Sequence, residues 1–177
     1  RDTKNRSNDV SPRFSIYNIS EEAINLSDLR INYFYTTDGP EKQIFEADWA
    51  GIGTQFQSSI ERNQVTCQFT EAGHNSLSTK TIADIGFTKD DVSIQPGQYL
   101  ELHVRIHRPE WTNYVQVNDY SLNQESKDYE EWKRIAVFIK NRWVYGSIPF
   151  DLADQIDPDP AQEEETQYQS DSKQSYT

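Results

Sequence analysis

Alternation of apolar and polar residues with a period of two dominates this sequence. In residues 29–35 the odd positions are large and apolar or aromatic, and the even positions are mostly polar. In residues 100–107 the even positions are all aliphatic, and the odd positions carry Glu, His or Arg. A period of two is typical of strands that bury one face and expose the other. The pattern therefore predicts an all-β chain.

Further candidate strands recur at roughly 10-residue spacing, which is typical of β-sandwiches and barrels. Turn-forming residues separate these segments at 37–40, 95–97 and 141–142. The further candidates are residues 14–17, 43–47, 65–69, 81–87, 135–139 and 143–145. We predict a β-sandwich of about eight to nine antiparallel strands.

The composition changes after residue 150. Residues 151–177 hold eight acidic side chains and one Lys, so they carry about −7 of the formal net charge of −12. We expect residues 1–150 to form one domain and residues 151–177 to be a disordered acidic linker or tail. A negative chain repels phosphate backbones and anionic lipids, so we expect neither nucleic acid nor a membrane surface as a partner.

Six segments, taken together, resemble the family-3 carbohydrate-binding modules of cellulases, cellulosome scaffolds and anti-sigma-factor biomass sensors. The resemblance covers nearly all of residues 1 to 148, and it implies a jelly-roll β-sandwich. The segments are Ser11–Phe14, Asp28–Gly39, Ala47–Ala50, Gln95–Gly97, Trp111–Ser121 and Trp143–Gly146. The family's first strand would precede Arg1 and is missing from this sequence. We therefore expect an unpaired sheet edge or a substitute for that strand.

Two tryptophans occupy positions where a strand is expected to end. Trp111 follows the strand that contains Arg105, and Trp49 follows Asp48 after another strand. Rings at such positions can stack on the flat faces of sugars, or they can fold back onto the core. The resemblance implies a flat carbohydrate-binding strip of Asp48, Trp49, Arg105 and Trp111. It also implies a further aromatic residue near Phe56.

Oxygen-bearing side chains form a second constellation. Asp38 lies in a glycine-containing turn, and Asn118 is followed by Asp119. Carboxylate, amide and carbonyl oxygens are the ligands that Ca²⁺ prefers. The resemblance brings these two loops together and adds Thr36 and the main-chain carbonyl of Val115. It thus implies a Ca²⁺ site with five contributing residues.

Catalytic motifs are weak by comparison. His103 and His107 share a strand face but have no third ligand nearby to make a zinc site, so we expect them to be exposed polar residues. No glycine-rich phosphate loop is present, and no specific Ser-His-Asp arrangement can be assembled. Acid pairs suited to glycoside hydrolysis stay possible in a chain with so many carboxylates. We nevertheless expect a binding module and not an enzyme.

The leading hypothesis is a non-catalytic module that adsorbs to cellulose or a related β-glucan. It would be monomeric, extracellular or at the cell surface, and tethered to a larger polypeptide such as an enzyme, a scaffold or a sensor. The alternative is a protein-interaction or accessory module with weak or no cellulose binding. Such a module would exchange strands with a neighbour or support an adjacent catalytic domain.

Overall fold

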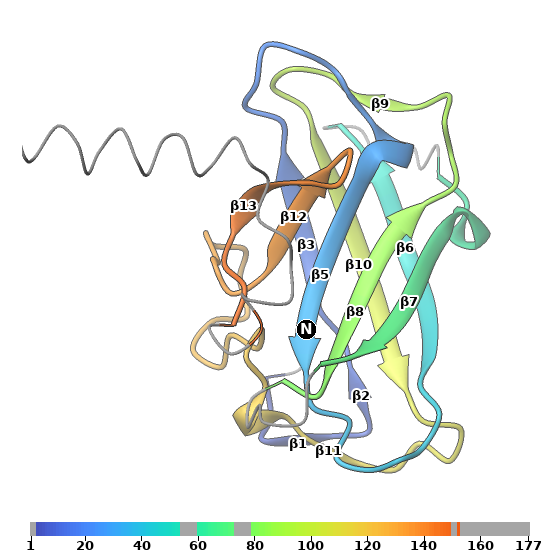
Figure 1. Ribbon diagram of the computed structural model, residues 1–177, viewed down its shortest axis with the longest axis vertical. Helices are drawn as coiled ribbons and strands as arrows, with labels where there is room; N and C mark the ends of the chain where they lie inside the picture. The colour runs from blue at the N-terminus through green and yellow to red at the C-terminus, as the bar shows by residue number, and fades with distance from the viewer. Residues whose placement is uncertain (1–2, 54–59, 73–78, 150–151, 153–177) are drawn as a thin grey trace, which may run out of the picture.

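The computed structural model describes residues 3–53, 60–72, 79–149 and 152. These residues form two antiparallel sheets packed face to face, with no α-helix in the described part of the chain (Figure 1). The eight longer strands are β3 (Arg13–Tyr17), β5 (Leu29–Tyr35), β6 (Ile44–Ile52), β7 (Val65–Glu71), β8 (Thr81–Phe87), β10 (Tyr99–His107), β12 (Ala136–Ile139) and β13 (Arg142–Gly146). The prediction of an all-β sandwich is confirmed.

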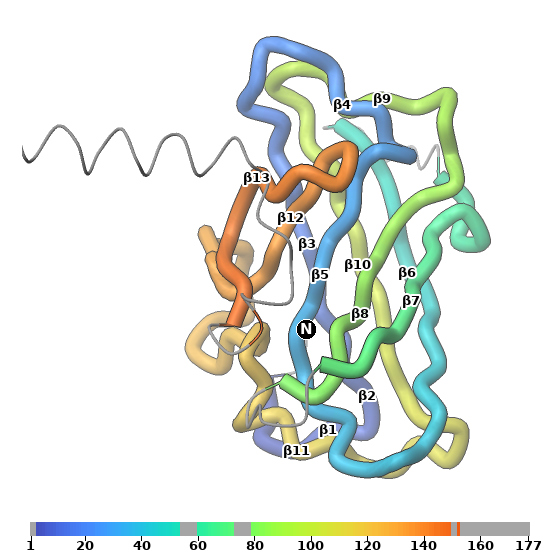
Figure 2. The backbone as a smooth tube through the Cα atoms, in the orientation of Figure 1, coloured from blue at the N-terminus to red at the C-terminus, as the bar shows by residue number. Residues whose placement is uncertain are grey.

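Short elements connect the longer strands. Five strands have only two residues: β1 (Arg6–Ser7), β2 (Asp9–Val10), β4 (Ile24–Asn25), β9 (Ser93–Ile94) and β11 (Tyr114–Val115). Three single-turn 3₁₀ helices are η1 (Leu26–Asp28), η2 (Arg62–Gln64) and η3 (Gln116–Asn118). The short pairs β1–β11 and β4–β9 tie loops together at the ends of the sandwich (Figure 2).

The two sheets have different sizes. One contains five strands in the order β13-β12-β5-β8-β7. In the other, β10 is central: β6 pairs with one side of it, and β3 and β2 pair with the other. Strand neighbours that are distant in sequence are typical of the Greek-key connections of a jelly roll.

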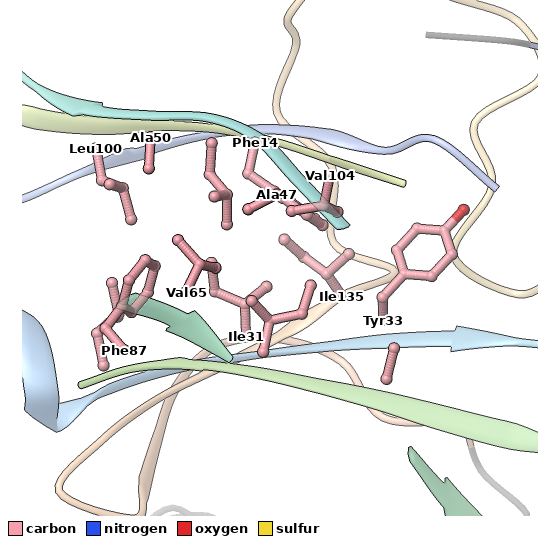
Figure 3. Packing of buried hydrophobic residues seen from close by; sticks show 14 of the residues in the cluster. Phe14, Ile31, Tyr33, Ala47, Ala50, Val65, Phe87, Leu100, Val104 and Ile135 are labelled. Carbon is pink, nitrogen blue, oxygen red and sulfur yellow. The ribbon is translucent and has the colours of Figure 1, made fainter. Parts of the chain in front are cut away.

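The alternating residues supply the core, as the period of two requires. Leu100 and Val104 of β10 point from one sheet toward Ile31 of β5 and Phe87 of β8 in the other (Figure 3). Each of these side chains is nearly or fully buried. Burial of one such aliphatic or aromatic side chain contributes about 1.5–3 kcal/mol, so this inner layer is the main source of stability.

The observed strands largely match the predicted ones, and β5 and β8 match to the residue. The exception is β6, which continues to Ile52, five residues beyond its predicted end. Asp48 and Trp49 therefore lie within a strand, and the expectation that they follow a strand is wrong. The cause is an extra residue in β6, which interrupts the alternation between Ala47 and Ala50.

Two observations bear on the ends of the chain. Among the described residues β3 pairs only with β10, so none of them pairs with its other side. Leu152 is 1% exposed and packs against Phe34 on the outside of the five-stranded sheet. Packing thus extends two residues beyond the predicted domain, and the other residues after 149 lie outside the described part.

No helix in the described residues is long and apolar enough to cross a membrane.

Candidate functional site

A β-bulge in β6 determines how the outer face of the smaller sheet is built. His103 of β10 pairs with Trp49, and the next residue, Val104, pairs with Ala47, so Asp48 has no partner in the ladder. Ala47 and Ala50 are both buried although they are three residues apart. The extra residue allows this spacing, and it leaves Asp48 and Trp49 together on the solvent side.

Arg105 joins the two strands on this face. Its Nε donates to Asp48 Oδ2 at 2.8 Å, and one of its terminal nitrogens donates to Asp48 Oδ1 at 2.8 Å. Glu46 Oε2 lies 2.8 Å from the same terminal nitrogen. The hydrogen bond to Asp48 raises the pKa of Arg105, so the guanidinium stays charged. This two-point contact fixes a planar group on the surface of the sheet.

Trp111 stands at the end of the sheet on a tight turn. Its backbone N–H donates to the carbonyl of Arg108 at 3.0 Å, and its φ of 52° lies in the left-handed region that bulky residues rarely adopt. The indole stacks on the ring of His107 with centroids 3.7 Å apart and planes 6° apart. It is still 41% exposed. The turn therefore presents one flat aromatic surface to solvent.

His107 was predicted to be an exposed polar residue, and that prediction is wrong. The side chain is buried because the indole of Trp111 covers it. Its Nδ1 lies 2.9 Å from the carbonyl oxygen of Arg108, which fixes the ring. Strand parity placed His107 correctly on the outer side of β10, but it gave no sign that the following turn folds back over that side.

Trp49 lies close to the strand surface on the same face. An added Cβ at Gly51 would sit 3.4 Å from the indole Nε1, so the ring extends over that glycine. The guanidinium carbon of Arg105 is 6.0 Å from the centroid of the Trp111 ring. We call Asp48, Trp49, Arg105 and Trp111 the strip. The fifth residue predicted for it, Phe56, lies outside the described residues.

The predicted Ca²⁺ ligands also come together, around the hydroxyl of Thr36. This Oγ1 lies 2.7 Å from Asp119 Oδ1, 3.3 Å from Asp38 Oδ1 and 3.4 Å from Asn118 Oδ1. Val115 joins through its backbone N–H, which donates to Asp38 Oδ2 at 2.7 Å. We call these five residues the Thr36 cluster. Thr36 and Asp38 follow β5, and the other three residues run from β11 through η3 to the residue after it. Both segments lie at the end of the sandwich to which β5 and β10 run (Figure 1).

The burial and hydrogen bonding of Asp119 indicate whether a cation would fit this cluster. The residue is buried, and its Oδ2 has no hydrogen-bond partner. Burial, opposed by the hydrogen bonds from Thr36, raises the pKa of Asp119 to about 7. An unpaired buried carboxylate is costly, and a cation held among hard oxygen donors would offset that cost. The cluster itself has only two carboxylates. No group of three His, Cys, Asp or Glu side chains suited to a metal occurs in the described part of the chain.

Arg108 links the strip to the Thr36 cluster, and sequence reasoning missed it. One terminal nitrogen donates to Thr112 Oγ1 at 2.9 Å and to the carbonyl of Asn113 at 3.1 Å. The other donates to the carbonyl of Thr37. The guanidinium carbon also lies 4.5 Å from the centroid of the Tyr114 ring. This buried side chain therefore braces the turn that carries Trp111 against the loop that carries Asp38.

A β-sandwich with aromatic rings and a paired arginine and aspartate on one outer face suits a carbohydrate-binding module. A comparison with family models identifies it further. The model of the cellulose-binding domain family CBM_3 matches residues 1–146, and the chain belongs to that family.

Two known proteins that resemble the chain are much larger than it. Exoglucanase-2 of Thermoclostridium stercorarium is 35% identical over 83% of this chain and 15% of that protein. Anti-sigma-I factor RsgI4 of Acetivibrio thermocellus is 32% identical over 77% of this chain and 25% of that protein. The chain thus spans a quarter or less of the length of these two relatives.

Solved structures agree with the assignment. The CBM3a-L domain with flanking linkers from the scaffoldin cipA of Clostridium thermocellum superposes with a TM-score of 0.76. It is 29% identical, and the match covers 82% of this chain and 85% of that one. The predicted fold and family are therefore confirmed, whereas the binding roles of individual residues stay predictions.

Proposed function

We propose that this module adsorbs to cellulose through the strip. The observation that carries the proposal is the joint placement of the Trp111–His107 stack, the Arg105–Asp48 pair and Trp49 on one outer face. A packed glucan presents apolar sugar faces flanked by rows of hydroxyl groups. Aromatic rings stack on the sugar faces, and the fixed guanidinium and carboxylate bind the hydroxyl groups between them.

The charge of the chain favours a neutral polymer. With a formal net charge of −12 the protein is repelled by nucleic acids and by anionic polysaccharides. Cellulose carries no charge, so this repulsion does not act on it. The chain would contact cellulose as a monomeric module and would not bind nucleic acid.

Calcium would have a structural role in this proposal. The ion would bind in the Thr36 cluster with the carboxylates of Asp38 and Asp119 and the side-chain oxygens of Thr36 and Asn118. The carbonyl of Val115 would complete the five contributing residues. Because Arg108 connects the two loops, a cation here would also steady the turn that presents Trp111.

The relatives indicate the setting. One is named as an exoglucanase and another as an anti-sigma factor, and each is far longer than the part that this chain matches. The module would thus belong to a larger polypeptide that acts outside the cell or at its surface. It would hold an enzyme, a scaffold or a sensor on the plant cell wall.

Depletion of the protein from solution by insoluble polysaccharides tests this function. The purified chain would be mixed with microcrystalline cellulose, amorphous cellulose, chitin and xylan, and the free protein measured at increasing total concentration. We expect saturable adsorption to cellulose and much less to xylan. Equal retention on all four polymers, or none on cellulose, would contradict the proposal. Sedimentation in solution measures the oligomeric state independently.

A further inference from the structure

Three side chains bring possible metal ligands to one point on the smaller sheet. His103 Nε2 lies 3.0 Å from Glu101 Oε1 and 3.0 Å from the hydroxyl oxygen of Tyr129. The Tyr129 hydroxyl donates to the same oxygen of Glu101 at 3.1 Å. The three atoms are therefore the corners of a nearly equilateral triangle. We call these three residues the His103 cluster.

The cluster joins the sheet to a distant segment. Glu101 and His103 are outward residues of β10, and both side chains are partly exposed. Tyr129 comes from the segment between η3 and β12, which contains no helix or strand. The spacing of the histidines along β10 therefore gave no sign of these ligands. His107 takes no part, because its ring lies under Trp111 and its Nδ1 faces the carbonyl of Arg108.

Hydrogen bonds alone do not satisfy all three contacts. The Tyr129 hydroxyl has one proton and His103 Nε2 has at most one, whereas the carboxylate of Glu101 only accepts. Two protons are thus shared among three close pairs of atoms. A cation bound to all three atoms would satisfy a lone pair on each of them at once.

The size of the triangle suits a small transition-metal ion. A tetrahedral zinc ion with bonds of about 2.1 Å holds its ligands about 3.4 Å apart, so the observed sides need to open by only about 0.4 Å. An imidazole nitrogen with two oxygens is also a ligand set that zinc accepts. We propose that the His103 cluster binds a divalent transition metal, with zinc as the expected ion, through His103 Nε2, Glu101 and the phenolate of Tyr129.

The charges near the cluster determine what binding requires. Burial and the nearby Glu101 raise the pKa of Tyr129 to about 12, so the hydroxyl keeps its proton without metal. Zinc would displace this proton to the solvent, and the phenolate and carboxylate would then balance the two charges of the ion. Arg13, the exposed ladder partner of His103, repels a cation but favours the phenolate. Binding should therefore release the phenol proton.

A metal here would act as a clip. It would hold the irregular segment that carries Tyr129 against β10, which now depends on the hydrogen bonds of the cluster. An ion bound only by the folded chain also adds to its stability. This site is distinct from the Thr36 cluster, whose donors are all oxygens, and the inference does not depend on adsorption to cellulose.

Calorimetric titration of the purified chain with zinc chloride tests the proposal. Excess calcium in the buffer keeps zinc from the Thr36 cluster. We expect saturable binding, a rise in melting temperature and the ultraviolet difference spectrum of a tyrosine phenolate. His103→Gln and Tyr129→Phe should each lower the affinity more than about a hundredfold, because loss of a mere outer-shell partner already costs about 10- to 100-fold.

Tyr145→Phe is the matched control. It removes the hydroxyl of a tyrosine on β13, in the other sheet, and should bind zinc like the wild type. Melting curves without zinc show whether each variant is folded, and two substitutions at different ligands keep the test open if one of them unfolds the chain. Absence of zinc binding by the wild type would overturn the proposal. Unchanged affinity of either folded ligand variant would also overturn it, because the ion would then be held elsewhere.

Discussion

The outer faces of the two sheets differ in what covers them. On the five-stranded sheet, Phe34 points away from the core between the sheets and is nevertheless fully buried. Ile148 and Leu152 pack over it, and Tyr120 meets its ring edge-on at 5.8 Å. The chain after β13 thus covers part of this face with a second, smaller core.

On the other sheet the corresponding face has no such cover in the described residues. Its rings are held by one another or by charges, as in the Trp111–His107 stack and the Tyr17–Tyr99 stack. Arg105 and Asp48 occupy its centre. One face therefore uses its aromatic residues for stability, and the other keeps them accessible. Substitutions on the two faces should separate stability from adsorption.

The largest effect on stability is expected from Leu152→Ala. The side chain is 1% exposed, and truncation of such a leucine costs about 2–5 kcal/mol because it leaves a cavity. For a domain of this size that loss lowers the melting temperature by roughly 2–4 °C per kcal/mol. Thermal unfolding measures it. Adsorption of the folded variant to cellulose should equal that of the wild type, and weaker adsorption would show that the two faces are coupled.

Calcium is expected to have the next largest effect on stability. A ligand bound only by the folded chain adds about 2.7 kcal/mol when it is present at about a hundred times its Kd. A chelator should remove this contribution and lower the melting temperature. Asp119→Asn keeps the acceptor for Thr36 but removes the charge that the cation needs, so its melting temperature should not respond to calcium.

Asp90→Asn is the matched control for this substitution. Asp90 is exposed, so the variant should respond to calcium like the wild type. Elemental analysis of the purified protein gives an independent measure of bound metal. Equal melting temperatures of the wild type with and without chelator, and no bound calcium, would remove the ion from the proposal.

On the open face Trp111→Ala should mainly affect adsorption. Loss of the terminal ring should weaken binding to cellulose at least about tenfold, or 1.4 kcal/mol, because the whole stacking surface at that end disappears. Stability should fall by only about 1 kcal/mol, the value of the stack on His107. Adsorption isotherms and melting curves of the same samples separate the two effects. Unchanged adsorption with a large drop in melting temperature would show that Trp111 is a structural residue.

The sequence predicted those parts of the fold in which each strand alternates regularly. β5 and β8 were located to the residue because one side of each strand carries the core residues. The predicted end of β6 came too early because Asp48, Trp49 and Ala50 interrupt that alternation. The extra residue that causes the interruption depends on pairing with a distant strand, which the sequence does not reveal. The family resemblance named the four described residues of the strip, which pattern alone could not have assembled.

Residues that act through distant contacts escaped prediction. Arg108 carries no motif, and its role depends on a carbonyl 71 positions away in the chain. Leu152 lies in a segment where aspartates break up the few apolar residues, so no clear apolar period marked it as buried. Phe34 was a missed signal: it is a large apolar residue at an even position of a strand whose odd positions are apolar. Such a break in alternation can indicate that the outer face is covered as well.

The smallest effect is expected from removal of residues 153–177. Those residues lie outside the described part of the chain, and their sequence is acidic and has no apolar period. Truncation after Leu152 keeps the buried leucine, so the free energy of unfolding should change by no more than about 0.5 kcal/mol. Adsorption to cellulose should also stay the same. Truncation after Ile148 is the matched comparison, since it removes Leu152 and should destabilise the protein like Leu152→Ala. If the shorter deletion alone unfolded the chain, residues beyond 152 would be part of the fold, and the interpretation of this segment as a linker would be wrong.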